Sequence, residues 1–123
     1  MDTSFLMHIA NNPLPNSNYL SEIQSYSLLT INEVINELLG ISKDTKVKRS
    51  KQARLALNYV KSIVCENITT RGNTDDKLVS CAMQKHGIIA SLDRDIIQKA
   101  DKLSLDYVTI EQGRLIWNIS YNK

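Results

Sequence analysis

Residues 86–95 read His-Gly-Ile-Ile-Ala-Ser-Leu-Asp-Arg-Asp and contain the clearest change from helix to strand and back to helix. Residues 88–92 form an apolar run of strand length, and Gly87 before it is the residue type that commonly ends a helix. Asp93 then opens a segment with helical spacing that continues to Leu103. A helix, a strand and a second helix therefore follow one another, with an acid at the carboxyl end of the strand.

The same alternation extends outward in both directions. Further strands are expected at 28–31, 106–110 and 114–119, further helices at 31–39, 46–64 and 74–86, and loops at 11–18, 40–45 and 69–74. Alternating strands and helices predict an α/β fold, a mostly parallel twisted central sheet with helices on both faces. In such sheets ligands bind beyond the carboxyl ends of the strands.

Length and composition favour one domain, residues 1–123, in the cytoplasm. The chain has 42% hydrophobic residues, a net charge of +2 and two cysteines, too few for a disulfide framework. It has no apolar run near the ~20 residues that span a bilayer and no recognisable secretion signal, so we expect no membrane partner. So small a net charge does not by itself imply a partner.

Two acids lie beside the helix starts. Asp93 follows the apolar strand at a typical catalytic position, although an Asp before a helix can equally serve as an N-cap. Asp76 lies in the first turn of its helix, beside Met83 at the border of the expected apolar face. The alternative for Asp76 is compensation of the helix dipole, a role that Asp75 could share.

Two further acids complete the candidate set. Glu37 falls at the edge of the apolar arc of its helix, whereas Glu33 points to the opposite side. The alternative is an ordinary solvated glutamate. Asp2 starts a polar segment that runs into apolar residues, and considered alone it could be a terminal or capping acid.

Three motifs resemble the PIN-domain family of ribonucleases, especially its compact archaeal and ribosomal-RNA-processing branch. Residues 1–6, Met-Asp-Thr-Ser-Phe-Leu, resemble its opening Asp-Thr-Asn/Ser signature, and residues 34–38, Val-Ile-Asn-Glu-Leu, resemble its helix with a Glu-Leu pair. Residues 75–79 together with 86–95 resemble its Asp-helix-strand-Asp-Arg-Asp block. The likeness covers nearly the whole chain and predicts a single PIN-like domain.

The resemblance implies a metal-dependent endoribonuclease. The implied catalytic and metal-binding acids are Asp2, Glu37, Asp76 and Asp93, and the implied supporting residues around them are Ser4, Asp75, Ser91 and Asp95. Carboxylates are hard oxygen ligands suited to Mg²⁺ or Mn²⁺, and converging acids repel one another unless a cation offsets their charge. The segment between Asp76 and Asp93 is about one residue shorter than the family pattern, which leaves Asp75 as the alternative to Asp76.

A basic stretch supplies candidate RNA contacts, which are Lys46, Lys48, Arg49, Lys51 and Arg54. A solvated helix face explains the same charges equally well. The sequence leaves three roles open: ribosomal-RNA processing or RNA decay, the toxin ribonuclease of a toxin–antitoxin pair, and a noncatalytic domain that binds RNA or protein. The partners expected besides RNA are a second copy of the chain and, for a toxin, an antitoxin.

Overall fold

The computed structural model describes residues 1–11, 26–44, 47–61, 64–66 and 72–120, with only the backbone for residues 47 and 64–66. Lys46 and most of the loops predicted at 11–18 and 69–74 lie outside these residues. The described helices are α1 (Thr3–Ala10), α3 (Asn32–Ser42), α4 (Val47–Val60), α5 (Thr74–Lys85) and α6 (Arg94–Lys102). The described strands are β1 (Leu29–Ile31), β2 (Val64–Glu66), β3 (Ile88–Ala90), β4 (Asp106–Glu111) and β5 (Arg114–Asn118).

The strands form two small sheets, so the predicted mostly parallel central sheet is wrong. In the described residues β1 pairs with β2 in parallel, and a separate mixed sheet has the order β3-β4-β5. Within it β3 and β4 are parallel and β5 is antiparallel to β4. The α/β class is correct, but its strands are distributed over two sheets.

The first two residues lie between these sheets and link them. The Met1 amino group donates a hydrogen bond to the Leu29 carbonyl at 2.9 Å, and the Thr30 hydroxyl donates to the Met1 carbonyl at 2.9 Å. On the other side the Asp2 amide donates to the Ala90 carbonyl at 3.1 Å. Two residues are too few to form a strand along the whole of β1 and β3, so the ladder is interrupted there.

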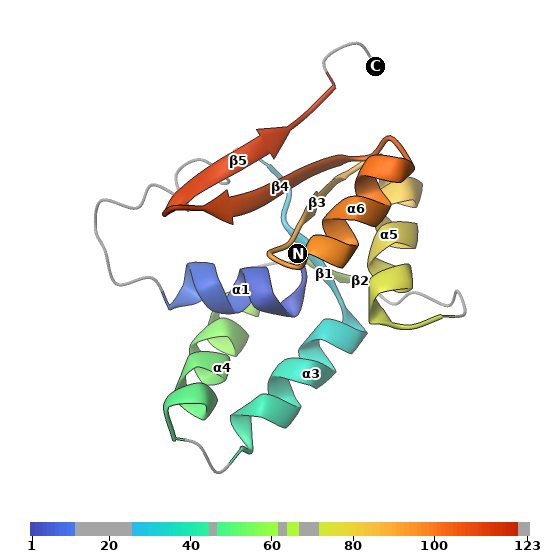
Figure 1. Cartoon of the computed structure of the whole chain (residues 1–123). Helices are drawn as coiled ribbons and strands as arrows, with labels where there is room; N and C mark the ends of the chain where they lie inside the picture. The colour runs from blue at the N-terminus through green and yellow to red at the C-terminus, as the bar shows by residue number, and fades with distance from the viewer. Residues whose placement is uncertain (12–25, 45–46, 62–63, 67–71, 121–123) are drawn as a thin grey trace.

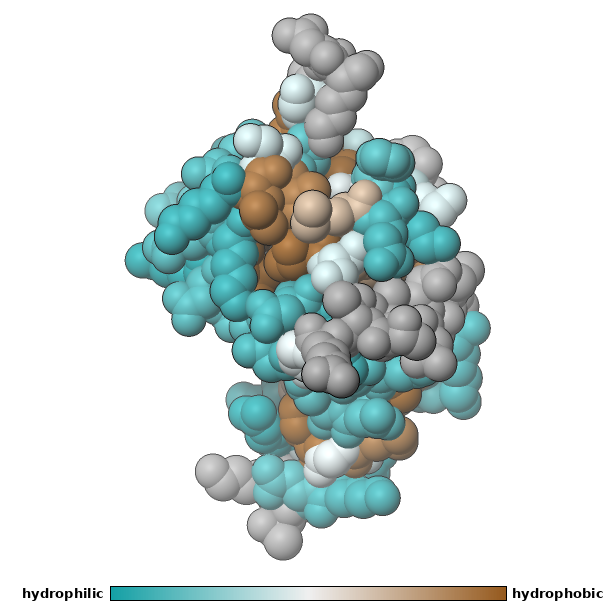
Figure 2. Space-filling view, turned by 90° about the vertical axis from the view of Figure 1, so that its right-hand side faces the viewer, coloured by the Kyte–Doolittle hydropathy of each residue, from teal (hydrophilic) through white to brown (hydrophobic). Residues whose placement is uncertain are grey.

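A cavity of about 340 Å³ lies where the two sheets fail to join. Its wall combines β1 and β3 with the buried side chains of Leu78, Cys81 and Ala82 from α5. Figure 2 shows a hollowed hydrophobic area on this side of the molecule, framed by hydrophilic side chains. The cavity is largely apolar, its wall contains none of the candidate acids, and the carboxylate in its wall is that of Asp106.

The helices divide into two groups around α1 (Figure 1). In Figure 1, α3 and α4 lie side by side below α1, the β3-β4-β5 sheet lies above it, and α5 and α6 lie to the right. The core joins them through fully buried side chains, among them Phe5 and Leu6 from α1 and Leu38 from α3. This arrangement brings the N-terminal ends of α1, α5 and α6 towards α3, and the candidate site lies there.

Candidate functional site

Four carboxylates line one hollow of about 510 Å³, which we call the acidic hollow. They are Asp2, Glu37, Asp75 and Asp93, and they come from four segments of the chain. Asp2 precedes α1, Glu37 lies in α3, Asp75 in the first turn of α5 and Asp93 precedes α6. Three of the four predicted acids therefore lie together, and Asp75 takes the place expected for Asp76.

Asp2 is the most buried of these acids, with 6% of its surface exposed. It caps α1 by accepting a hydrogen bond from the Phe5 amide at 2.9 Å. The Ser4 hydroxyl donates to both of its carboxylate oxygens, at 3.0 and 3.1 Å, and the buried Ser91 hydroxyl donates to Oδ2. Burial raises the pKa of Asp2, and the bonds from Ser91, Phe5 and Ser4 oppose that shift.

Ser4 and Ser91 also connect Asp2 to the loop that carries Asp93. The Ser4 hydroxyl accepts from the Leu92 amide at 3.3 Å, and the Ser91 hydroxyl accepts from the Asp93 amide at 2.9 Å. Each hydroxyl therefore both donates and accepts, which fixes its orientation. These contacts fit the supporting role expected for the two serines.

Asp93 caps helix α6, the structural role that the sequence offers as the alternative to catalysis. Its carboxylate accepts from the Asp95 amide at 2.8 Å and so caps α6, while the side chain stays exposed and lines the acidic hollow. Capping uses one oxygen, and the other remains available to the hollow. Asp95 contributes its backbone to this cap, and its side chain does not line the hollow.

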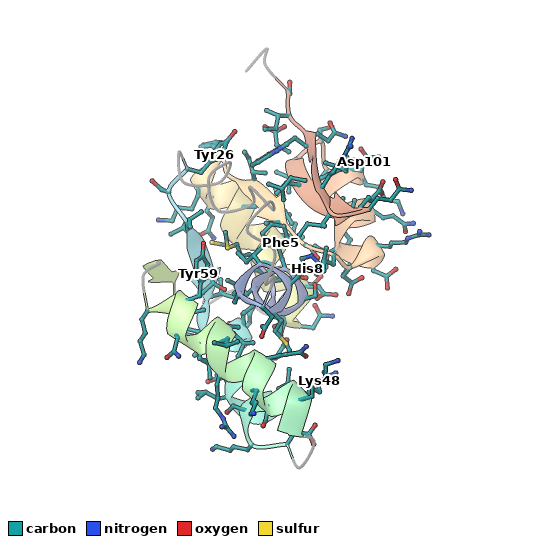
Figure 3. The ribbon with its side chains drawn as sticks, turned by 90° about the vertical axis from the view of Figure 1, so that its left-hand side faces the viewer. Phe5, His8, Tyr26, Lys48, Tyr59 and Asp101 are labelled. Carbon is teal, nitrogen blue, oxygen red and sulfur yellow. The ribbon has the colours of Figure 1, made fainter. Side chains whose placement is uncertain are left out.

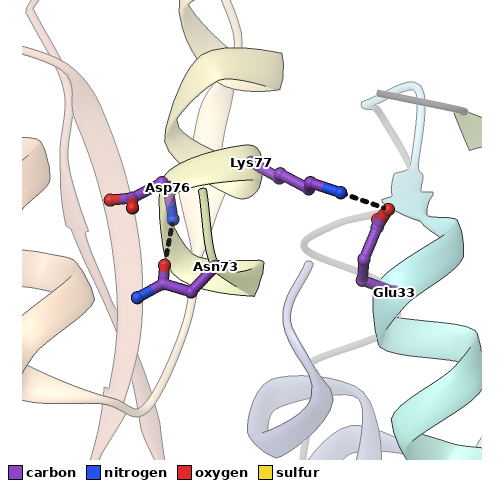
Figure 4. Close-up of polar contacts among 4 residues, drawn as sticks. All are labelled: Glu33, Asn73, Asp76 and Lys77. Atoms are coloured by element: carbon purple, nitrogen blue, oxygen red, sulfur yellow. Dashed lines mark hydrogen bonds and ion pairs between the residues drawn. The ribbon is translucent and has the colours of Figure 1, made fainter. Parts of the chain in front are cut away.

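Asp75 and Asp76 point to different environments. Asp76 is exposed and forms an ion pair with Lys99, with Nζ 3.3 Å from Oδ1. Figure 4 shows Asp76 on the opposite side of α5 from Lys77, whose ammonium group binds Glu33 of α3 at 3.2 Å. Asn73 caps this helix by accepting from the Asp76 amide at 2.9 Å. Asp75 is half-buried and is the acid of α5 that lines the hollow.

The pKa of Asp75 is sensitive to the other acids of the hollow, because they lie close to it. Its pKa is raised from its ordinary value by partial burial and then by the charge of Asp93, with smaller effects of the same sign from Asp2 and Glu37. Lys99 opposes the shift. Four carboxylates thus share one field, and Asp75 experiences the repulsion of the other three.

Glu37 is held at the rim by Thr3, a residue that the sequence did not single out. The Thr3 hydroxyl donates to Oε2 of Glu37 at 2.6 Å and so links the start of α1 to α3. Because both residues line the acidic hollow, this bond orients the Glu37 carboxylate beside it. The Thr in the Asp-Thr-Ser motif was the available signal.

The donor chemistry fits a hard divalent cation, although the oxygens are spread apart. In the described part of the chain, no group of three His, Cys, Asp or Glu side chains is close enough to bind one ion. Asp2 and Glu37 are instead held by hydroxyl donors, and Asp93 by a helix amide. Side-chain rotation of Asp75, Asp93 and Glu37 towards Asp2 is needed to gather one ligand set.

The basic residues lie on α4, across from α1. Lys48, Arg49, Lys51 and Arg54 are all exposed, and Figure 3 shows Lys48 and Tyr59 at opposite ends of this helix. The Arg54 guanidinium donates to Ser50 at 3.3 Å within the helix. Arg49 differs from the others because it lines the acidic hollow.

Among the described residues, no helix is both long enough and apolar enough to cross a membrane. The sequence matches no model of a known protein family. A comparison with curated proteins likewise found no significant match.

Proposed function

We propose that the chain is a metal-dependent endoribonuclease of the PIN-domain type, acting in the cytoplasm. The observation that supports it most is the acidic hollow, where Asp2, Glu37, Asp75 and Asp93 converge from four segments. Capping explains Asp2 and Asp93 one at a time, but it does not explain why four separate acids face one hollow at the cost of mutual repulsion. A site that binds a cation does explain it.

Mg²⁺ or Mn²⁺ bound by these acids would activate a water molecule and offset the charge that develops on the phosphate. The contribution of the protein itself is to position the carboxylates around the hollow. Ser4 and Ser91 hold Asp2 in a defined orientation, and Thr3 links Glu37 to the start of α1, from where Glu37 would turn towards Asp2 when a cation binds. Asp75 and Asp93 line the same hollow, and they would supply further oxygens to the ion or accept the proton of the attacking water.

Hydrolysis of the RNA phosphodiester consumes one water molecule and produces two RNA ends. Water attacks phosphorus, its proton passes to a carboxylate, and the bond from phosphorus to the leaving ribose oxygen breaks. The leaving oxygen takes up a proton and becomes a hydroxyl, and the other product retains a terminal phosphate. Ribosomal-RNA processing, RNA decay and the toxin role share this chemistry, and a neighbouring antitoxin gene would favour the toxin.

A noncatalytic RNA-binding or protein-binding domain is the second candidate. It is favoured by the engagement of Asp2 and Asp93 as helix caps and by the separation of the described acid oxygens. In that case the acids stabilise helix ends and the basic face of α4 binds the partner. The two candidates differ in whether metal ions produce cleavage.

The test compares wild type with Asp93→Asn on single-stranded and structured RNA, with Mn²⁺, Mg²⁺ or chelator. Asn also caps helices, so this change preserves the start of α6 while removing the charge. We expect metal-dependent cleavage by wild type and a loss of at least about 100-fold in Asp93→Asn. Asp101→Asn, at the exposed far end of α6 (Figure 3), is the matched control and should cleave as wild type does.

Equal cleavage by wild type and Asp93→Asn in every condition would exclude the proposed nuclease. RNA binding without cleavage, together with no thermal shift on adding Mn²⁺, would instead favour the noncatalytic domain.

A further inference from the structure

Arg49 is the basic residue that lines the acidic hollow among the residues that the structure describes. It lies in the first turn of α4, and its side chain is exposed. Lys48, Lys51 and Arg54 share the helix but do not line the hollow. Arg49 therefore differs from its basic neighbours by position and not by charge.

A second hollow, of about 500 Å³, continues from the first one. Its wall is formed by Glu37, Gly40, Ile41, Asp44 and Arg49. Glu37, Ile41 and Arg49 belong to both walls, so these residues mark the boundary between the two hollows. A strand of RNA that enters the acidic hollow can continue past Arg49 into the second one.

The guanidinium group at this boundary has no hydrogen bond or ion pair within the described part of the chain, although Glu37 lines the same walls. Four carboxylates repel an approaching phosphate, so binding of RNA needs a cation beside them. A guanidinium provides two parallel N–H donors that match two phosphate oxygens, which an ammonium group does not. Arg49 has the chemistry and the place for this contact.

We propose that Arg49 binds the RNA phosphate next to the scissile one and so positions the strand across the acidic hollow. This inference rests on the proposed ribonuclease function and adds to it one residue that holds the substrate. It also separates Arg49 from the general positive charge of α4, which attracts RNA without fixing its position.

The test measures binding of a fluorescein-labelled single-stranded oligoribonucleotide by anisotropy in EDTA, over a series of KCl concentrations. The variants are Arg49→Gln, Arg49→Lys and the matched control Arg114→Gln, an exposed arginine at the start of β5 that lines neither hollow. We expect about 10-fold weaker binding for Arg49→Gln and a salt slope reduced by about 0.7, the value for one lost phosphate contact on a single strand. Arg49→Lys should recover part of the affinity, and Arg114→Gln should remain within about 2-fold of wild type.

Equal losses in Arg49→Gln and Arg114→Gln would overturn the proposal, because RNA would then respond to the total positive charge of the protein and not to the position of Arg49. Unchanged binding in Arg49→Gln would overturn it as well. Mn²⁺-dependent cleavage by wild type decides the ribonuclease function separately. If Arg49 binds RNA but the protein never cleaves it, the phosphate contact is supported and the nuclease function is excluded. If Arg49→Gln cleaves RNA as wild type does, only the proposed phosphate contact is excluded.

Discussion

At the scale of single residues, Asp75 is the acid whose ionisation is disfavoured by the other carboxylates of the acidic hollow. Its pKa is raised by burial and by the charges of Asp93, Asp2 and Glu37. The folded chain therefore holds the Asp75 proton more tightly than the unfolded chain does. As the pH rises above the ordinary pKa of 3.8, ionisation of Asp75 lowers the free energy of unfolding.

Replacing Asp75 by Asn should therefore stabilise the protein when no metal is present. In EDTA at pH 7 we expect Asp75→Asn to raise the Tm by about 1–3 °C, because a neutral side chain removes the repulsion. The gain should disappear near pH 3, where Asp75 is protonated in both states. Thermal melts over a pH series measure this, and added Mn²⁺ should stabilise wild type more than the variant.

Asp76→Asn is the matched control for this prediction. It removes an exposed ion pair with Lys99, so its Tm should be unchanged or slightly lowered. A rise in Tm for Asp76→Asn equal to that for Asp75→Asn would show that the stabilisation comes from general charge and not from the hollow.

The choice between these two aspartates shows the limit of helical periodicity. The sequence favours Asp76 because it lies beside Met83 at the expected border of the apolar face, but Met83 is 50% exposed. Asp75 is three and four residues before Leu78 and Val79, which are buried, and that spacing places it above the core face. An apolar residue type indicates burial only on average. Because Met83 is apolar but exposed, counting it as buried places the edge of the buried face of α5 in the wrong position.

At the scale of elements, the β4–β5 hairpin depends on two residues with left-handed backbone. Gln112 has φ 50° and Gly113 has φ 75°, and a two-residue turn that matches strand twist needs positive φ at both positions. Asn adopts this region more readily than Gln, and a β-branched residue adopts it poorly.

Gln112→Asn should therefore raise the free energy of unfolding by about 0.3–0.5 kcal/mol, and Gly113→Val should lower it by about 1–2 kcal/mol. Gly113→Asn should fall between wild type and Gly113→Val. Both positions are exposed, so these changes alter backbone conformation without altering the core. Urea unfolding measures them, and equal stability of Gly113→Asn and Gly113→Val would contradict the backbone explanation.

Most elements could be predicted from the sequence, but α1 and β2 could not. The helix expected at 46–64 ends at Val60, and residues 64–66 form a strand against β1. Val60, Ile63 and Val64 continue the helical spacing, so periodicity gives no sign of the boundary. By contrast, α5 ends where Gly87 predicted, with His86 in the left-handed conformation at its C-cap.

At the scale of the whole molecule, the sequence could predict the alternation of strands and helices but not how the strands pair. Sheet order depends on contacts between distant segments, here the bonds from Met1 and Asp2 to Leu29 and Ala90. No local pattern encodes such contacts. The same long-range contacts bring Asp2 beside Asp93. The motifs single out Asp2, Glu37 and Asp93, but they favour Asp76 over Asp75 and do not give the geometry of the hollow.

The interrupted pairing leaves the 340 Å³ cavity, and a larger apolar side chain in its wall should stabilise the fold. Ala82 is buried at 8% exposure and faces this space from α5. Ala82→Leu fills part of the cavity with three carbon atoms and should raise the free energy of unfolding by about 1 kcal/mol. Urea unfolding at pH 7 measures the change, with the m-value confirming that both proteins unfold to the same extent.

Ala100→Leu is the matched control, because Ala100 is also a helical alanine but is fully buried and does not line the cavity. There the extra carbon atoms have no space, so stability should fall by about 1–3 kcal/mol. Opposite signs for the two variants mean that the space between the sheets is open in solution. If Ala82→Leu is as destabilising as Ala100→Leu, other atoms fill the space between β1 and β3. The two sheets then pack together more tightly than the hydrogen bonds between them indicate.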